Sequence, residues 1–173
     1  NFQLRSNKLL TNSTYCVSTP NTLVNDAQWE FSVRLLFNTS SANFVDIYLC
    51  SDQANVFSPG VNGYFVRIGG TTDEVSLYKS VVGVKTKIID GIDGTTNYST
   101  NELKVKVKCS ATGEWSLEQK SFSALDYMLE GTATDLSITT SAYFGIAITQ
   151  STASFFQKHF FDDIYVGPII YDL

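Results

Sequence analysis

Histidine is almost absent from this chain of 173 residues, which holds His159 and no other. A Ser-His-Asp triad would need that histidine, and the Gly-x-Ser-x-Gly turn that presents the nucleophile in many hydrolases does not occur. Zinc sites usually draw on several histidines or cysteines. We therefore expect His159 to be an ordinary strand residue rather than a catalytic group or a metal ligand.

Cysteine is also scarce. Cys16, Cys50 and Cys109 lie far apart in the sequence, and no Cys-x-x-Cys pair occurs. An odd number of thiols cannot pair completely, so a disulfide framework is not expected. Cysteine behaves as a small hydrophobic residue when it is buried. We expect buried free thiols, with a single disulfide between two of the three as the alternative.

The chain has few positively charged residues. It contains 12 Lys and Arg and 17 Asp and Glu, which gives a net charge of −5. Nucleic-acid binding needs clustered Lys and Arg. The one basic run, residues 104–108, alternates lysine with valine, which is the pattern of a strand with a solvated face. No segment approaches 18 consecutive apolar residues, the length of a membrane-spanning helix. We expect neither a nucleic-acid partner nor insertion into a membrane.

The chain also lacks an initiating Met and a signal peptide, since it begins Asn1-Phe2-Gln3-Leu4. Its length fits one domain with a sizeable core. We therefore expect residues 1–173 to be a single β-sandwich domain that is excised from, or part of, a larger secreted protein.

Alternation of apolar and polar residues is what the chain has in abundance. Trp29, Phe31, Val33, Leu35 and Phe37 share one parity, while polar residues hold the other. A period of two is that of a β-strand with one dry and one wet face. Twelve Phe and nine Tyr also suit pleated sheets. Without a credible helix, strands are expected over residues 2–5, 8–11, 28–37, 44–50, 64–68, 74–79, 84–89, 103–109, 114–120, 126–131, 143–149 and 155–166.

This number of short strands with hairpin turns predicts an all-β fold, an antiparallel two-sheet jelly-roll sandwich. In such a sandwich the two sheets pack face to face. We expect one sheet to curve and to present a concave outer face, on which the polar-parity residues of several strands converge.

Aromatic residues on the wet parity are the feature most relevant to binding. Flat rings stack on the faces of sugars, and a tyrosine ring also has a polar edge for hydroxyl groups. The same pattern also fits rings that pair across strands on a solvent face, and rings that a loop covers. The predicted ligand-binding residues of the concave sheet are Arg34, Asp46, Tyr48, Phe65, Arg67 and Tyr78.

Two adjacent carboxylates, Asp162 and Asp163, precede the end of the last expected strand. Neighbouring side chains of a strand point to opposite faces unless a bulge intervenes. An inward carboxylate must be hydrogen-bonded or bind a cation, and calcium prefers clustered oxygens. One interpretation is an Asp satisfied by backbone amides of the adjacent turn. The other is a structural calcium at this pair, with further oxygens from the loops that carry Asp90, Asp93 and Asp135.

A series of short motifs follows in order along most of the chain. They are Trp29-x-Phe-x-Val-x-Leu-x-Phe37, Asp46-Ile-Tyr-Leu-Cys-Ser-Asp52, Gly63-Tyr-Phe-Val-Arg-Ile-Gly69, Gly113-Glu-Trp-Ser-Leu117, Glu130-Gly-Thr-Ala-Thr-Asp135, Tyr143-Phe-Gly-Ile146 and Phe161-Asp-Asp-Ile-Tyr-Val-Gly167. This ordered set resembles a module of secreted surface proteins of Bacteroidetes, similar in architecture to the concanavalin A-like lectin/glucanase superfamily. The resemblance implies an extracellular or cell-surface β-sandwich that is often joined to other domains. It implies no established activity.

Catalytic members of that superfamily carry Glu-x-Asp-x-x-Glu on one strand, because alternate residues of a strand point into the same cleft. Glycosidases need two carboxylates that flank the scissile bond. Glu114, Glu118 and the pair Asp73–Glu74 do not reproduce the spacing. We therefore expect no catalytic residue and a binding module rather than an enzyme.

Together these features predict a non-catalytic carbohydrate-binding or adhesion module of a bacterial extracellular protein, with a glycan or polysaccharide as its partner. No cofactor other than a structural calcium is expected. One alternative is a structural or protein-interaction spacer domain, which would lack an aromatic-lined groove. The other is a divergent glycoside hydrolase or lyase, which would need two carboxylates about 5–10 Å apart across a cleft.

Overall fold

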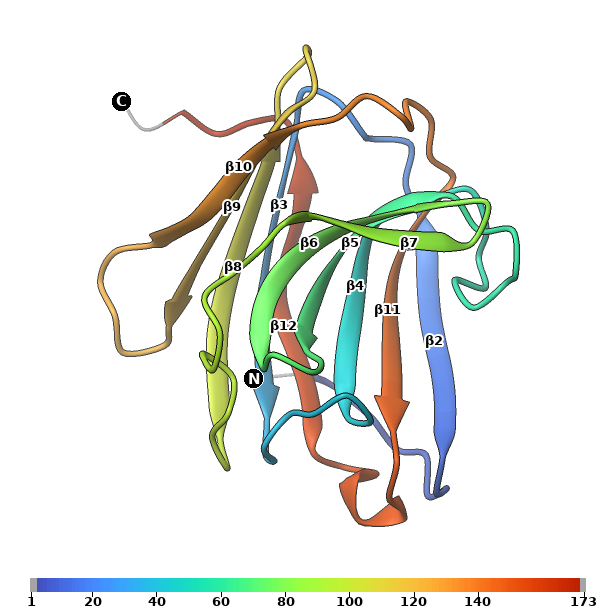
Figure 1. Ribbon diagram of the computed structural model, residues 1–173, viewed down its shortest axis with the longest axis vertical. Helices are drawn as coiled ribbons and strands as arrows, with labels where there is room; N and C mark the ends of the chain where they lie inside the picture. The colour runs from blue at the N-terminus through green and yellow to red at the C-terminus, as the bar shows by residue number, and fades with distance from the viewer. Residues whose placement is uncertain (1–2, 172–173) are drawn as a thin grey trace.

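A computed structural model describes residues 3–171, which form two antiparallel sheets of six strands each and one short 3-10 helix (Figure 1). Sheet A has the strand order β1-β12-β3-β8-β9-β10, and sheet B has the order β2-β11-β4-β5-β6-β7. The elements are β1 (Leu4–Arg5), β2 (Ser13–Pro20), β3 (Ala27–Leu35), β4 (Phe44–Ser51), β5 (Gly63–Gly69), β6 (Glu74–Val81), β7 (Val84–Ile89), β8 (Asn101–Cys109), β9 (Glu114–Ser121), β10 (Met128–Thr134), β11 (Tyr143–Gln150), η1 (Ala153–Phe155) and β12 (His159–Gly167).

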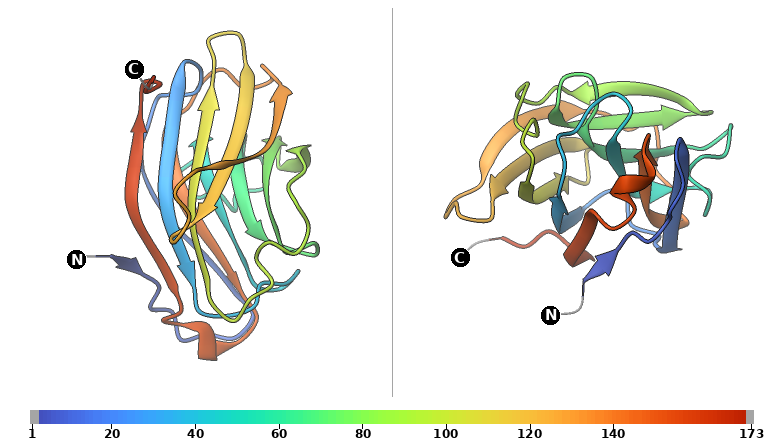
Figure 2. Two further views of the ribbon diagram at one scale, coloured as in Figure 1. Left: turned by 90° about the vertical axis from the view of Figure 1, so that its left-hand side faces the viewer. Right: turned by 90° about the horizontal axis from the view of Figure 1, so that it is seen from below.

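The two sheets lie face to face as two layers (Figure 2), so the predicted all-β sandwich is confirmed. The first two and the last two strands are divided between the sheets. In sheet A, β1 pairs with β12, and in sheet B, β2 pairs with β11. The prediction of one domain over residues 1–173 includes residues 1–2 and 172–173, which lie outside the described residues. Within residues 3–171, no helix has the length and apolar character needed to cross a lipid bilayer.

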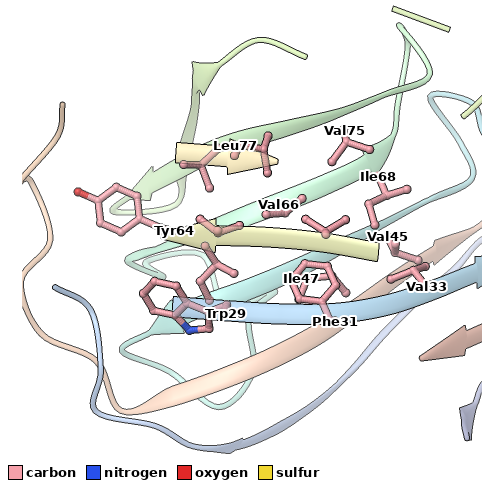
Figure 3. Packing of buried hydrophobic residues seen from close by; sticks show 14 of the residues in the cluster. Trp29, Phe31, Val33, Val45, Ile47, Tyr64, Val66, Ile68, Val75 and Leu77 are labelled. Atoms are coloured by element: carbon pink, nitrogen blue, oxygen red, sulfur yellow. The ribbon is translucent and has the colours of Figure 1, made fainter. Parts of the chain in front are cut away.

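The core follows directly from the alternation seen in the sequence. In the register between β3 and β8, Trp29 lies opposite Val107 and Phe31 lies opposite Val105, so apolar residues meet on the inner face. Trp29 also stacks on Trp115 of β9, with ring centroids 5.9 Å apart. The lysines of residues 104–108 lie on the outer, solvated face of sheet A, as their parity predicts. Figure 3 shows side chains of the two sheets meeting in this core, among them Trp29, Phe31 and Val33 of β3, Val45 and Ile47 of β4, Tyr64, Val66 and Ile68 of β5, and Val75 and Leu77 of β6.

The N-terminal strands differ from the prediction. No strand covers residues 8–11, and the unpredicted strand β2 lies at residues 13–20 instead. This strand is the edge of sheet B, where it pairs with β11 alone, and most of its side chains are exposed. A strand with so little buried surface needs no apolar alternation, and its final residue, Pro20, is tolerated at a sheet edge.

The three cysteines are free thiols in the structure, and two of them, Cys50 and Cys109, are buried as expected. Burial raises the pKa of Cys50 and of Cys109 to about 12, whereas Cys16 is only half-buried. Because the thiolate is the reactive form, we expect only Cys16 to react with a disulfide reagent in the native protein at about pH 8. Counting titrated thiols before and after denaturation tests this, with all three reacting in denaturant. A native Cys16→Ser variant that still reacts would contradict the expectation.

Candidate functional site

Five of the six predicted ligand-binding residues lie together on the outer face of sheet B. The apolar parity of β4, β5 and β6 points into the core, so the opposite parity faces outward. Asp46 of β4 lies opposite Arg67 of β5. In the next row, Tyr48, Phe65 and Tyr78 lie side by side on three neighbouring strands. The register therefore produces a charged row next to an aromatic row.

Arg34 does not belong to this group, and the prediction that it lines the same concave sheet is wrong. It lies on β3 of sheet A, opposite Glu102 of β8, and its guanidinium is 4.4 Å from the ring centroid of Phe160. Parity along one strand identifies the wet face but does not say which sheet the strand joins. The wet faces of β3 and β4 point to opposite sides of the sandwich.

Two rings of the aromatic row are covered rather than open to a ligand. The ring centroids of Tyr48 and Phe65 are 4.7 Å apart, and those of Phe65 and Tyr78 are 5.2 Å apart. The loop between β4 and β5 buries Val56 and Val61 against these rings. As a result, Tyr48 is 1% exposed and Phe65 is 0% exposed. A loop therefore covers these two rings, which is one of the alternatives that the sequence left open.

The far edge of sheet B curls over the same face, where β6 and β7 arch across β4 and β5 (Figure 1). In a flat sheet, β7 would lie about 14 Å from β4, because three steps of about 4.8 Å separate them. Yet Nζ of Lys85 on β7 is 3.2 Å from a carboxylate oxygen of Asp46 on β4. The same Nζ is 4.9 Å from the ring centroid of Phe65. The outer face of sheet B is therefore concave at this end, as predicted; below, it is called the concave face.

One buried carboxylate holds two cations on the concave face. Asp46 accepts hydrogen bonds from Nε and Nη2 of Arg67 at 2.7 and 2.8 Å and from Nζ of Lys85 at 3.2 Å. The guanidinium of Arg67 also lies 4.2 Å from the ring centroid of Phe44 and 5.1 Å from that of Tyr78. A bidentate arginine–carboxylate pair fixes the orientation of both groups. Arg67 is therefore presented in one defined position between two rings.

A second ion-pair group extends the concave face and was not predicted from the sequence. The buried carboxylate of Glu74 accepts hydrogen bonds from Ser76 at 2.7 Å and from Lys87 of β7, which also donates to Asp90. Burial alone would raise the pKa of Glu74, but the bonds from Lys87 and Ser76 hold it below its usual value. Alternate residues of β6 and β7 carry these groups, and only the register of the hairpin brings them together.

The part of the concave face that remains open to solvent combines two aromatic rings with three cations. Rings can stack on flat ligand faces, and the cations can donate hydrogen bonds to hydroxyl or carboxylate oxygens. The buried carboxylates beneath them fix the positions of the cations. We call this set the open cluster, and its members are Phe44, Arg67, Tyr78, Lys85 and Lys87.

The Asp162–Asp163 pair lies in a bulge of β12, where the register with β3 shifts and Asp163 adopts a φ of 50°. The carboxylate of Asp163 is 64% exposed and accepts hydrogen bonds from Ser32 at 3.1 Å and Lys104 at 3.3 Å. Calcium takes six to eight oxygen ligands. Over the part of the chain that the structure describes, no group of three or more His, Cys, Asp or Glu side chains is arranged to hold a metal ion. Because an ammonium group already binds Asp163, this donor set does not fit calcium.

His159 is the first residue of β12, and its side chain is buried beside the N-terminal segment. Its Nδ1 is 2.9 Å from the hydroxyl of Ser6, and its ring packs edge-on against Phe37 at 4.9 Å between centroids. Burial lowers the pKa of His159 to about 4. The imidazole is therefore neutral at pH 7, and it connects the N-terminal segment to β12.

A cavity of about 270 Å³ lies elsewhere, between the N-terminal segment and sheet B. Its lining is mainly apolar, with Leu4, Val17, Ile146, Ile148 and Phe161 among the residues. Hydroxyl groups would find few hydrogen-bond partners there. The concave face is therefore the better candidate for a polar ligand.

No protein-family profile and no curated protein sequence matches the chain. The fold is nevertheless similar to that of solved lectin domains. The exoplasmic/lumenal domain of VIP36, in a Ca²⁺/Man-bound form, has a TM-score of 0.71 and 10% sequence identity, over 99% of this chain and 80% of that chain. A legume lectin-like domain from Entamoeba histolytica has a TM-score of 0.66 and 9% identity, over 97% and 84% of the two chains.

A bacterial binding module has the same architecture. The carbohydrate binding module CBM66 from Bacillus subtilis has a TM-score of 0.58 and 10% identity, over 96% of this chain and 92% of that chain. Likenesses at such low identity concern the fold. They show that this chain has the concanavalin A-like sandwich of legume-lectin-type domains.

Proposed function

We propose that this protein is a non-catalytic carbohydrate-binding module, and that the open cluster on the concave face is its glycan site. The observation that carries the proposal is the combination of partly open rings with firmly held cations on one curved sheet. The comparisons support it, because VIP36 was solved in a Man-bound form and CBM66 is named a carbohydrate binding module.

The chemistry of the open cluster suits a sugar. Tyr78 stacks on the buried ring of Phe65, so its own ring is held rigidly while it remains partly open. The guanidinium of Arg67 is fixed by Asp46 and has N–H groups left to donate to hydroxyl oxygens. A site that is ordered before binding loses little conformational entropy when a ligand arrives.

The proposal includes a wider setting. The ordered motifs that resemble secreted Bacteroidetes proteins support a module of a larger bacterial protein at the cell surface, with adhesion to glycans as its role. Residues 1–173 would then be one domain of that protein. Calcium is not part of the proposal, because the donor set at Asp163 does not fit it.

Hydrolysis is not part of the proposal either. A general acid needs a raised pKa so that it is protonated near neutral pH. The pKa of Glu74 is instead lowered by Lys87 and Ser76, and Asp46 is occupied by two cations. Neither buried carboxylate of the concave face is free to act as an acid.

A second candidate function is a structural or protein-interaction spacer. The observation that favours it is the coverage of Tyr48 and Phe65, which shortens the aromatic row to one accessible ring. A spacer would bind no glycan, so one experiment separates the two candidates.

We expect Tyr78→Ala to weaken glycan binding by about tenfold or more, because one stacked ring contributes on the order of 1 kcal/mol beyond its buried area. A glycan array with the wild-type protein identifies a ligand, and calorimetry then measures its affinity for both proteins. Circular dichroism and thermal unfolding establish that the variant is folded.

The matched control is Tyr98→Ala, which removes an exposed tyrosine from the loop between β7 and β8. This variant is expected to bind as the wild type does. Binding to no glycan of the array, or equal loss in both variants, would contradict the proposed site.

A further inference from the structure

The charges of the open cluster point to a class of ligand. We propose that this site, if it is the glycan site proposed above, prefers acidic glycans, and that the carboxylate of a uronic acid lies between Arg67 and Lys85.

The first step is the local balance of charge. Asp46 is the carboxylate partner of both Arg67 and Lys85, with two contacts from Arg67 and one from Lys85. Over residues 3–171, neither cation has another carboxylate within ion-pair distance. Two positive charges thus share one negative charge, and one positive charge is left over. Lys87 differs, because its one charge faces two carboxylates, Glu74 and Asp90, so the excess of positive charge is confined to Arg67 and Lys85.

The second step is the depth at which these charges lie. The side chain of Asp46 is 2% exposed, whereas those of Arg67 and Lys85 are 20% and 34% exposed. The negative group is therefore beneath the surface, and the cations lie above it. A ligand that approaches Arg67 and Lys85 therefore meets the positive groups first, even though the whole chain has a net charge of −5.

The third step is hydrogen-bonding capacity. Arg67 uses Nε and Nη2 on Asp46, so Nη1 remains to donate. Lys85 donates to Asp46 and has two further N–H groups. A planar carboxylate can accept from both residues at once, and such charge-assisted bonds are about twice as strong as those to a neutral hydroxyl. The guanidinium of Arg67 lies over the ring of Tyr78, 5.1 Å from its centroid, and the part of this half-buried ring that stays exposed can contact the rest of the sugar.

The test compares uronate oligosaccharides with the same molecules after reduction of their carboxyl groups to alcohols. The probes are oligomers of galacturonate, glucuronate and mannuronate, each measured by calorimetry in both forms. The wild-type protein is expected to bind at least one acidic form about tenfold more tightly than its reduced form, as a partly exposed ion pair allows. This preference should shrink as salt rises from about 0.05 to about 0.5 M.

Lys85→Met is expected to remove most of the ratio between acidic and reduced forms. The control is Lys108→Met, which removes a lysine from the outer face of sheet A and should leave the ratio as it is. If neutral glycans bind through Tyr78 but no uronate is preferred, this inference fails and the proposed function stands. If no glycan of either kind binds, both fail.

Discussion

Asp135→Asn is expected to lower the free energy of unfolding by about 3 kcal/mol, because it breaks a largely buried ion pair at the centre of a hydrogen-bond network. The carboxylate of Asp135 is 12% exposed and accepts hydrogen bonds from the hydroxyl of Tyr64, from Nζ of Lys79 and from the backbone N–H of Ser137. Its own carbonyl accepts from the indole N–H of Trp115. Asp135 thus joins β5 and β6 of sheet B to β9 of sheet A.

The same network is expected to lose part of its stabilising effect at low pH. Burial alone would raise the pKa of Asp135, but the bonds from Lys79, Tyr64 and Ser137 outweigh it and hold the pKa at about 2. An unfolded Asp has a pKa near 3.8. The stabilisation is therefore complete above about pH 4 and is lost as the pH falls toward 2, and it amounts to about 2 kcal/mol.

Urea unfolding of Asp135→Asn and of a matched control measures both effects. The control is Asp163→Asn, which removes another Asp–Lys pair, but one whose carboxylate is 64% exposed. Exposed pairs contribute less than about 1 kcal/mol. Equal losses in the two variants would show that the network around Asp135 does not hold the two sheets together.

Strands with a buried face were predictable from the sequence, because their side chains must alternate to bury one side. The segment from Trp29 to Phe37 shows this, since its apolar parity became the inner face of β3. Edge strand β2 was not predictable by the same rule, because most of its side chains are exposed and lack the alternation. The network at Asp135 was missed too, because the loop after β10 meets Tyr64 and Lys79 only in three dimensions.

For the candidate site, the sequence predicted which residues of each strand face outward, but not how the strands and loops come together. Parity placed Asp46, Tyr48, Phe65, Arg67 and Tyr78 on one wet face, and the register of β4, β5 and β6 brought them together. Parity could not reveal which sheet a strand joins or what covers it. Membership of a sheet, the position of a loop and the curvature of a strand pair depend on contacts between segments that are distant in sequence.

Those non-local contacts decided the site. Strand pairing puts Arg34 in the opposite sheet, and the loop between β4 and β5 packs Val56 and Val61 over Tyr48 and Phe65. Curvature had the opposite effect, because it added Lys85 from a strand that a flat sheet would keep too far away. The ligand proposed for the concave face therefore depends on a charge that strand parity alone did not assign to it.

His159 is expected to make the protein less stable by about 3 kcal/mol when the pH falls from about 7 to about 4. Its ring is fully buried, and its Nε2 has no hydrogen-bond partner among the described residues. The hydroxyl of Ser6 donates to the carbonyl of Phe156 at 2.8 Å. Nδ1 of His159 must therefore carry the proton that is shared with Ser6, and a second proton would place a charge at Nε2 in an apolar core.

The direction of this pH dependence follows from the difference between the pKa of His159 in the folded protein and in the unfolded chain. Burial lowers the pKa of His159 to about 4 in the folded protein, while an unfolded histidine has a pKa near 6.5. Between these values the unfolded chain binds more protons, so the free energy of unfolding rises with pH. The stabilisation is complete above about pH 6.5 and lost toward pH 4, a window that lies above that of Asp135.

His159→Gln keeps a neutral polar group beside Ser6 and removes the titration. Its free energy of unfolding should change little between about pH 7 and about pH 4.5, whatever its value at neutral pH, because no group at position 159 takes up a proton. Urea unfolding across this range compares the slopes of the two proteins, and NMR of the imidazole gives the pKa directly. An equal slope in the variant would place the acid sensitivity on other groups and would mean that His159 tolerates its second proton in the fold.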